Sequence, residues 1–355
     1  MYRTAFLAAG IIGAALATAQ GGPEAGSWGA GSRRGANVGM WLRASDLQVL
    51  ASWGADHVRL QILSPYLEEA DGRVWFKPES EASLVRFLQE AEQVGLAVVV
   101  DCHAHGLFFP DDNWRPEALE RWRDPQAVAK LADFCRHLAR LCRGNRTVIG
   151  YDLLNEPHPP YSDEGYQAWN RVAEHVTRAI REVDQVRTVV IGCASYANPG
   201  GMAKLEPVSD PNVVYSFHMY LPHEFTEQGT RPQWPAGQVY PGTIGLGWDE
   251  KTPTQVEAAW LRESVKAVVE FQRRHAARIW VGEFSARRDA PQDSALRYLS
   301  DVLALFDEQG WDWAYHAFRE SSTWDLELPA NPEAKKRQGS TPRLELLRSY
   351  WKRGE

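Results

Sequence analysis

The stretch TVIGYDLLNEP, residues 147–157, begins as an apolar run and ends in two polar side chains, Asn155 and Glu156. An apolar run of this kind is typical of a strand that is buried on both faces of a parallel sheet. A carboxylate at the end of such a strand costs free energy unless another group uses it. The stretch therefore predicts a buried parallel strand that delivers Glu156 to a site.

Seven further strand-like runs alternate with helix-like segments along the chain. They occupy residues 36–42, 57–62, 96–103, 188–197, 212–220, 278–286 and 311–320. Between them apolar residues recur at spacings of three and four, as at Leu84, Phe87, Leu88 and Ala91, where Gly95 is expected to end a helix. Eight strand–helix units within about 320 residues predict an α/β fold, the (β/α)8 or TIM barrel.

An open, doubly wound sheet is the competing fold. That fold favours a glycine-rich phosphate-binding turn after its first strand, and the segment GMWLRASD, residues 39–46, has none. The sequence also lacks a linker rich in proline and serine, an internal repeat and a change of composition. We therefore expect residues 20–355 to form a single barrel domain.

One connection departs from the alternation of strands and helices. Residues 221–253 show no clear periodicity, are rich in proline and glycine, and carry Trp234, Tyr240 and Trp248. Connections longer than about 15 residues are usually functional in compact domains. After this connection, Thr254 and Glu257 are expected to form a capping box that starts the next helix.

Composition and charge restrict the classes of function. The 355 residues carry a net charge of −7 and no cluster of lysine and arginine, so nucleic acid is not expected as a partner. The 15 tryptophans exceed what a core needs, and their flat rings indicate contact with a ligand. Cys135 and Cys142 lie two helical turns apart, about 10 Å, which is too far for a disulfide. We expect all four cysteines to be free and buried.

The N-terminus has the pattern of a targeting segment. Arg3 precedes the apolar run AFLAAGIIGAALA, residues 5–17, and the small residues that end at Ala19 fit a cleavage site. The apolar run is shorter than the roughly 20 residues that a membrane-spanning helix needs. We expect residues 1–19 to be a signal peptide cleaved near Ala19. The mature chain should then be secreted, monomeric and without a membrane partner.

In a barrel of this kind the chemistry lies at the carboxyl ends of the strands. Those ends carry Trp41, Arg59, Asp101, His103, His105, Asn155, Glu156, Ser195, Tyr196, His218, Tyr220, Glu283, Tyr315, His316 and Arg319. Glu156 and Glu283 stand on different strands, so only tertiary folding can join them. Two carboxylates across a barrel mouth are what glycoside hydrolysis needs, since one protonates the leaving oxygen and the other meets the oxocarbenium-like centre.

Several of these segments together resemble glycoside hydrolase family 5, the cellulase family. LLNEP, residues 153–157, resembles its acid/base motif, and WVGEF, residues 280–284, resembles its nucleophile motif. HVRLQI with Arg59, DCH with His103, and FHMY with His218 and Tyr220 match its other active-site segments, in the family's order. The resemblance extends over essentially the whole chain after the N-terminal segment.

The resemblance implies a retaining mechanism without a cofactor or metal. Glu156 is then the general acid and afterwards the general base, and Glu283 is the nucleophile that forms a covalent glycosyl-enzyme. Asn155 is implied to hold the sugar 2-hydroxyl, and Arg59 and Tyr220 to keep Glu283 ionised and oriented. Because Glu156 follows an apolar run, we expect its carboxyl group to be desolvated.

The resemblance also implies which residues surround the cleaved sugar. His103 and His218 are expected to line its subsite and the surroundings of the acid. The family usually has a tryptophan after the tyrosine of the last strand, whereas this chain has His316. Other rings could supply the stacking face instead, namely Trp313, Phe318 or Trp324. Further candidate platforms for sugar units are Trp41, Trp114, Trp122 and Trp248.

The expected substrate is a β-1,4-glucan polysaccharide or oligosaccharide, cleaved internally as by a cellulase. β-Mannan, mixed-linkage glucan and β-1,3-glucan remain open under the same mechanism. A metal-dependent barrel hydrolase is an alternative from another class, since His103 and His105 form a pair at a strand end. Such a site would need an Asp at the carboxyl end of the last strand, where this chain has YHAFRE, and its His pair on the first strand rather than the third. A non-catalytic sugar-binding protein is a third alternative. Such a protein would be expected to lack one of the two glutamates, and both are present here.

Overall fold

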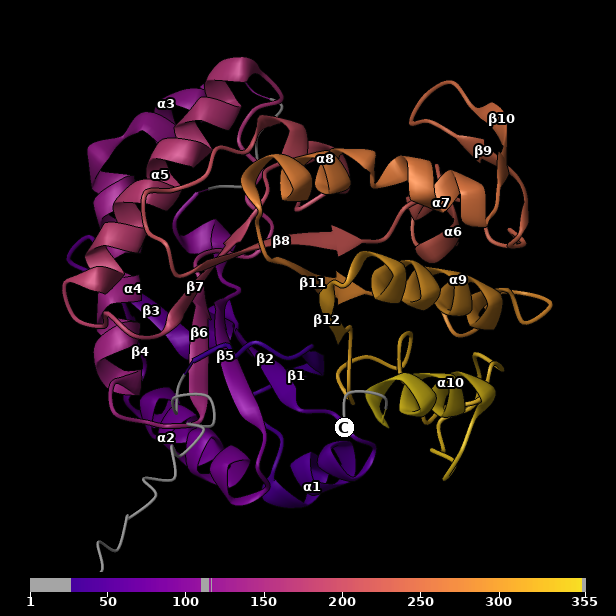
Figure 1. Cartoon of the computed structure of the whole chain (residues 1–355), viewed down its shortest axis with the longest axis horizontal. Helices are drawn as coiled ribbons and strands as arrows, with labels where there is room; N and C mark the ends of the chain where they lie inside the picture. Colours follow the sequence, from indigo (N-terminus) through magenta and orange to yellow (C-terminus); the bar gives the residue numbers. More distant parts are fainter. Residues whose placement is uncertain (1–26, 110–114, 116, 353–355) are drawn as a thin grey trace, which may run out of the picture.

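Eight parallel strands close into a barrel in the computed structural model, which describes residues 27–109, 115 and 117–352 (Figure 1). Around the barrel the strands follow the order β1 (Arg34–Gly39), β12 (Asp312–Tyr315), β11 (Ile279–Phe284), β8 (Val213–Met219), β7 (Thr188–Gly192), β6 (Val148–Asp152), β5 (Ala97–Cys102) and β2 (His57–Ile62). Every neighbouring pair is parallel, and β1 pairs with both β2 and β12. The predicted TIM barrel is confirmed.

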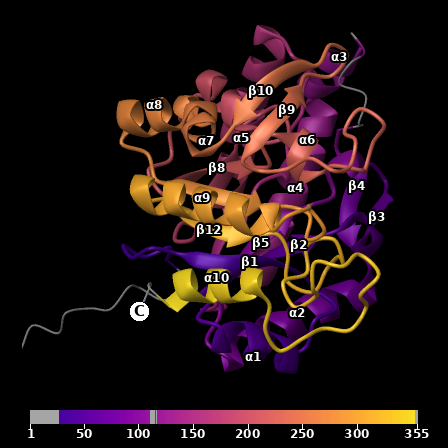
Figure 2. The same ribbon diagram turned by 90° about the vertical axis from the view of Figure 1, so that its right-hand side faces the viewer.

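Helices cover the outside of the barrel (Figures 1 and 2). They are α1 (Ala44–Ser52), α2 (Pro78–Gln93), α3 (Ala118–Arg123), α4 (Pro125–Cys142), α5 (Asp163–Arg181), α7 (Ala258–Ser264), α8 (Lys266–His275), α9 (Ser294–Gln309) and α10 (Pro342–Trp351). Short 3-10 turns occur at η1 (Ser64–Tyr66), η2 (His105–Leu107) and η3 (Pro199–Lys204). The apolar stripe Leu84, Phe87, Leu88 and Ala91 is buried on α2, as its spacing predicts.

The core has two parts because each strand faces both the helices and the barrel interior. The larger part lies between the strands and the helices. The smaller part fills the barrel interior near the amino ends of the strands and consists of Trp28, Val99, Ile149, Val190, Val214, Trp280 and Ala314. Beyond this apolar plug the inward positions are polar, with Arg59 and Asp101 fully buried. The carboxyl ends of the strands therefore carry a polar layer on an apolar base.

Two β-hairpins extend from the barrel, and neither was expected. β3 (Leu67–Ala70) pairs with β4 (Arg73–Phe76), and β9 (Gly242–Leu246) pairs with β10 (Thr252–Val256). The second hairpin and the short helix α6 (His223–Thr226) structure the connection that showed no periodicity, and Figure 1 shows this hairpin beyond α7.

The predicted capping box at the end of that connection is wrong. Thr254 lies inside β10, where its backbone is committed to the ladder with β9. Glu257 is itself the N-cap of α7, and a new helix, α8, starts at Lys266.

All four cysteines are free and buried, as predicted. Among the residues that the structure describes, no helix combines the length and the apolar character that crossing a membrane requires. The expected signal peptide, residues 1–19, falls outside the described residues.

Candidate active site

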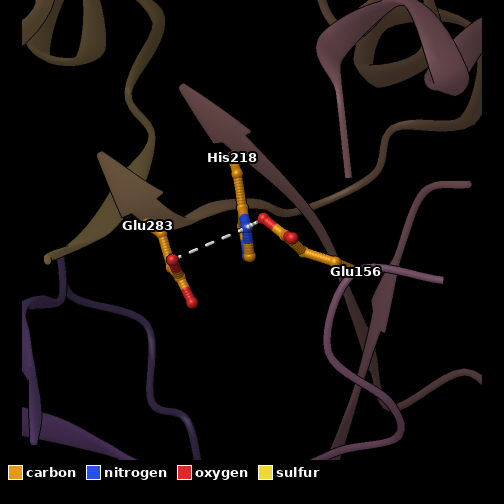
Figure 3. A group of neighbouring side chains, drawn as sticks. All are labelled: Glu156, His218 and Glu283. Atoms are coloured by element: carbon orange, nitrogen blue, oxygen red, sulfur yellow. Dashed lines mark hydrogen bonds and ion pairs between the residues drawn. The ribbon is translucent and has the colours of Figure 1, made fainter. Parts of the chain in front are cut away.

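Glu156 and Glu283 face each other across the carboxyl end of the barrel, with His218 between them (Figure 3). A carboxylate oxygen of each glutamate and a ring nitrogen of His218 all lie within 4.8 Å of one another. His218 Nδ1 is 2.8 Å from Glu156 Oε1 and 3.9 Å from Glu283 Oε2. The fold thus brings together a carboxylate that follows β6 and a carboxylate within β11.

A bulge in β11 turns Glu283 toward the barrel interior. Ile279 and Val281 pack on the helix side of β11, so strict alternation would send Glu283 to that side as well. The pairing of β11 with β8 instead shifts register between Val281 and Glu283. A bulge of this kind re-aims the side chains that follow it. Glycine at position 282 leaves room for two side chains of β8, since a Cβ there would lie 2.8 Å from Ser216 Oγ and 3.1 Å from His218 Nε2.

Glu156 stands four residues beyond the end of β6, in a left-handed backbone conformation with φ 47°. A non-glycine residue in this region carries strain of about 1 kcal/mol, which active sites often hold. Its carbonyl oxygen lies 2.7 Å from His158 Nδ1. The Glu156 side chain is 29% exposed, so the expected desolvation is met only in part.

Both carboxylate oxygens of Glu283 are hydrogen-bonded by buried donors. Arg59 Nη1 donates to Oε1 at 2.6 Å, and the Tyr220 hydroxyl donates to Oε2 at 2.9 Å. Burial, followed by the negative charge of Glu283, raises the pKa of Tyr220, so the hydroxyl remains a donor. These two contacts fix the orientation of the Glu283 carboxylate.

Arg59 is the fully buried cation around which the floor of the site is built. Its guanidinium donates to Asp152 Oδ2 at 2.9 Å and lies 3.0 Å from Asp101 Oδ1. It also donates to Asn37 Oδ1 at 3.1 Å and to Asn155 Oδ1 at 3.0 Å. The planar fork of arginine matches this set of acceptors, which a lysine ammonium group could not satisfy together.

The electrostatic surroundings keep Glu283 ionised. Burial by itself would raise the pKa of this carboxyl group. Positive charge outweighs burial and holds the pKa well below its ordinary value, with His316 contributing most, followed by His218 and Arg59. The sequence predicted Arg59 as the stabilising cation, and the structure adds two histidines to it.

His316 lies beside Glu283, the candidate nucleophile, at the position where the family usually has a tryptophan that stacks on the sugar. Its Nδ1 is 3.3 Å from Glu283 Oε2, and its Nε2 is 3.9 Å from Glu320 Oε1. Of the three alternative rings, Trp324 lies closest to this place, 6.4 Å from the His316 ring and 6.3 Å from the Tyr220 ring.

The other two alternative rings are in the core. Trp313 is fully buried and packs against Phe284, and Phe318 packs edge-on against Trp53. They cannot stack on a sugar, so the expectation for these two rings is wrong.

His103 and His105 do not form a common site. His103 Nδ1 lies 2.7 Å from Asp101 Oδ2, and although burial would lower the pKa of His103, the charge of Asp101 raises it. His105 stacks on His158 with ring centres 3.7 Å apart, and burial lowers its pKa to about 2. The alternative of a metal hydrolase using this pair loses its geometric basis.

Glu156, His218 and Glu283 are the group of possible metal ligands that the described residues bring together. Their ligand atoms are already engaged. Arg59 and Tyr220 occupy the two oxygens of Glu283, and His218 occupies Glu156 Oε1. The donor set therefore fits a hydrogen-bonded pair of carboxylates better than a cation site.

The candidate tryptophan platforms differ in exposure. Trp41 is 43% exposed, and its ring lies so close over Gly39 that a Cβ there would collide with it. Trp248 is 52% exposed on the β9–β10 hairpin, and it contacts the Trp234 ring edge-on. Trp122 is buried and stacks on Phe109 at 4.0 Å, so the expectation for Trp122 is wrong. Trp114 lies outside the described residues.

Sequence reasoning gave no role to several residues of the site. Asn37 is a lone polar residue within an apolar strand, and Asp152 is a lone carboxylate in the apolar run before Asn155. Burial raises the pKa of Asp152 to about 7, against the charge of Arg59. A charged or amide side chain at an inward position of an otherwise apolar strand is the sequence pattern that could have identified Asn37 and Asp152 as site residues.

Comparison with known proteins agrees with this arrangement. The model of a family described as Cellulase (glycosyl hydrolase family 5) matches residues 28–322. Endoglucanase C of Acetivibrio thermocellus is 27% identical over 299 residues, which cover 78% of this chain and 84% of that protein. Cellodextrinase A of Ruminococcus flavefaciens is 23% identical, and the match covers 78% of this chain and 82% of that protein.

Solved structures share the fold. One described as an endoglucanase superposes with a TM-score of 0.70 at 20% identity, covering 89% of this chain and 96% of the other. Cel5A of Thermotoga maritima, in a structure with cellobiose, superposes with a TM-score of 0.69 at 21% identity, covering 89% and 97%. At these identities the likeness establishes the barrel.

Proposed function

Because the chain belongs to the cellulase family, glycosyl hydrolase family 5, whose model matches residues 28–322, we propose that it is a secreted endo-β-1,4-glucanase. The chain is a retaining glycoside hydrolase that acts on β-glucan. The proposal covers the β-1,4 linkage, internal attack on the chain, secretion, a single domain from residue 20 to 355, and the role of each side chain.

In the first step Glu283 attacks the anomeric carbon while Glu156 gives its proton to the glycosidic oxygen. The observation that carries this assignment is the distance of less than 4.8 Å between a carboxylate oxygen of Glu156 and one of Glu283. Retaining enzymes need their two carboxyl groups about 5–5.5 Å apart, because the second one bonds directly to the sugar. The contacts of Glu283 with Arg59 and Tyr220 hold it ionised and aimed for this attack.

In the second step Glu156 removes a proton from water, which attacks the anomeric carbon and releases Glu283. Glu156 suits both steps because its side chain is 29% exposed and can exchange protons with solvent. His218, 2.8 Å from Glu156 Oε1, orients the carboxyl group in both. Asn155 would bind the sugar 2-hydroxyl from its place beside Glu156 and against Arg59.

Two variants test the roles of the glutamates. Glu283→Gln should abolish turnover while leaving the fold intact, as circular dichroism would show, and full activity would reject Glu283 as the nucleophile. Glu156→Ala should lose activity on a glycan but regain it with azide on a substrate whose leaving group needs no proton. Absence of azide rescue would reject Glu156 as the acid/base.

A panel of soluble polysaccharides tests the substrate. We expect the release of reducing ends from β-1,4-glucan to exceed that from β-mannan, mixed-linkage glucan, β-1,3-glucan and xylan. A rapid fall in viscosity with few reducing ends released would support internal attack. Preferential cleavage of mannan or β-1,3-glucan would replace the substrate while keeping the mechanism.

A further inference from the structure

A histidine lies between two carboxylates directly after β12. The Nδ1 atom of His316 is 3.3 Å from Glu283 Oε2, and its Nε2 atom is 3.9 Å from Glu320 Oε1. The side chains of His316 and Glu320 are both largely buried. Among the residues that the structure describes, neither His316 Nδ1 nor Glu320 Oε2 has a hydrogen-bond partner of good geometry. Buried polar atoms of this kind are costly unless they have a use.

Each nitrogen of the His316 ring faces a carboxylate oxygen. An ionised carboxylate has only acceptors, so a ring nitrogen needs a hydrogen to bind it. A histidine ring carries a hydrogen on both nitrogens only as the imidazolium cation. The geometry therefore favours the cation, with Glu320 as the acceptor that completes it on the Nε2 side.

The remaining groups around this pair come from other strands. The Tyr220 ring, after β8, lies 6.3 Å from the His316 ring at nearly a right angle, and its hydroxyl donates to the same oxygen of Glu283 that His316 faces. Against the effect of burial, the groups that lower the pKa of Glu283 after His316 are His218 on β8, Arg59 on β2 and His103 after β5. Glu320 is the carboxylate that faces His316 from the side opposite to this cluster of donors.

The segment that carries Glu320 is held in place by two arginines. Arg319, the preceding residue, donates to Glu327 Oε2 at 2.6 Å. Arg288, which lies beyond β11 and is buried, donates to the carbonyl oxygen of Ser322 at 2.6 Å. A charged group held in this way needs little reorganisation at the moment of reaction.

We propose that Glu320 is a positioning residue that holds His316 as an imidazolium cation beside Glu283, and that this cation accelerates the second step of the reaction. The proposal rests on the proposed function and extends it to the position where the family usually has a tryptophan. An indole ring carries no charge, so this chain differs from that pattern in its electrostatics as well as in its shape.

The direction of the effect follows from the charge of Glu283 along the reaction. Glu283 is fully charged in the free enzyme, partly charged in both transition states and neutral in the glycosyl-enzyme. A neighbouring cation therefore stabilises the free enzyme more than the first transition state, and the second transition state more than the glycosyl-enzyme. In the second step water attacks the anomeric carbon, its proton goes to Glu156, and the electron pair of the broken bond returns to the Glu283 oxygen beside His316.

A fluorinated substrate measures the two steps separately. 2,4-Dinitrophenyl 2-deoxy-2-fluoro-β-cellobioside transfers its sugar to the nucleophile, and the fluorine slows hydrolysis so that the glycosyl-enzyme can be isolated. The rate of inactivation reports the first step, and the rate at which activity recovers after removal of the reagent reports the second. For Glu320→Gln we expect recovery to be about tenfold slower, as for the loss of one interaction with a charged group, and inactivation to be at least as fast as in the native protein.

Two further variants show whether Glu320 acts through His316. In a His316→Asn background, Glu320→Gln should have no further effect on recovery, because the ring that it positions is absent. Glu327→Gln is the matched control, since Glu327 belongs to the same segment but pairs with Arg319. It should leave the ratio of the two rates unchanged even where it lowers stability.

NMR of the histidine ring nitrogens reads the protonation directly. At neutral pH, 1H–15N spectra should show hydrogen on both ring nitrogens of His316 in the native protein and on only one in Glu320→Gln. The His316→Asn variant assigns the signal, because it is then missing.

The outcomes are distinct. Equal recovery rates in the native protein and Glu320→Gln, or a loss that persists without His316, would overturn the proposal. Equal slowing of inactivation and recovery would also overturn it, since a charge effect is expected to act on the two steps in opposite directions. A neutral His316 ring in the native protein would overturn it as well. Failure of the reagent to label Glu283 would instead reject the proposed function, and this proposal with it.

Discussion

Replacing Arg59 by methionine should destabilise the fold and inactivate the nucleophile together. The guanidinium is fully buried and lies 2.6 Å from Glu283, 2.9 Å from Asp152 and 3.0 Å from Asp101. Methionine fills much of the same volume but leaves three buried carboxylates without their common cation. Removing one partner of a buried ion pair costs about 3–5 kcal/mol, because the remaining charge stays desolvated.

The loss should depend on pH in a defined direction. In the native protein the pKa of Glu283 lies below its ordinary value near 4.5. Ionised Glu283 therefore contributes stability above pH 4.5, and this stability is lost only as the pH falls through the folded pKa. Without Arg59 the pKa of Glu283 rises. The deficit of the variant should therefore be largest at neutral pH and shrink as the pH falls through the raised pKa of Glu283 toward 4.5.

Denaturant unfolding of both proteins between pH 4 and pH 8 measures this effect, and activity at neutral pH reports the nucleophile. Arg262→Met is the matched control, because Arg262 forms an exposed ion pair with Glu308, which is worth about 0–1 kcal/mol. Equal unfolding free energies for native protein and Arg59→Met would refute the reasoning. A deficit that does not change with pH would refute the assignment of the cost to unpaired carboxylates.

Three further changes have defined outcomes. Tyr220→Phe removes the hydroxyl that donates to Glu283 at 2.9 Å, and kcat/KM should fall about tenfold to a hundredfold while the protein stays folded. An unchanged kcat/KM would contradict a role for this bond. His316→Asn removes the imidazole whose Nδ1 lies 3.3 Å from Glu283 Oε2 and which contributes most to lowering the pKa of Glu283. A 13C NMR titration of labelled glutamate should then show a higher pKa for that carboxyl group, and a constant value would be evidence against the electrostatic role. Trp248→Ala removes an exposed ring on the β9–β10 hairpin, and KM for a long β-1,4-glucan should rise severalfold while kcat changes little; an unaltered KM would exclude Trp248 from binding.

Much of the barrel could be predicted because its strands are buried on both faces. β5 reads as a short apolar run that leads to Asp101, whereas β2 is equally buried but alternates apolar residues with His57, Arg59 and Gln61. The hairpins β3–β4 and β9–β10 escaped prediction because their strands are short and alternate only weakly between buried and exposed positions. Thr254 and Glu257 match a capping box locally, but pairing with β9 takes Thr254 into a strand.

The sequence by itself determined which residue types stand at the strand ends, because burial of the preceding run leaves only those ends for polar chemistry. It named Glu156, Glu283 and Arg59 on this basis. Only the tertiary structure decided that Glu283 points inward, since alternation along β11 alone would turn it toward the helices and the bulge at Gly282 reverses it. Likewise, the histidines that lower the pKa of Glu283 come from β8 and from the segment after β12, and these two strands flank β11 in the closed barrel. Contacts of this kind depend on register and closure, which no local pattern of residues records.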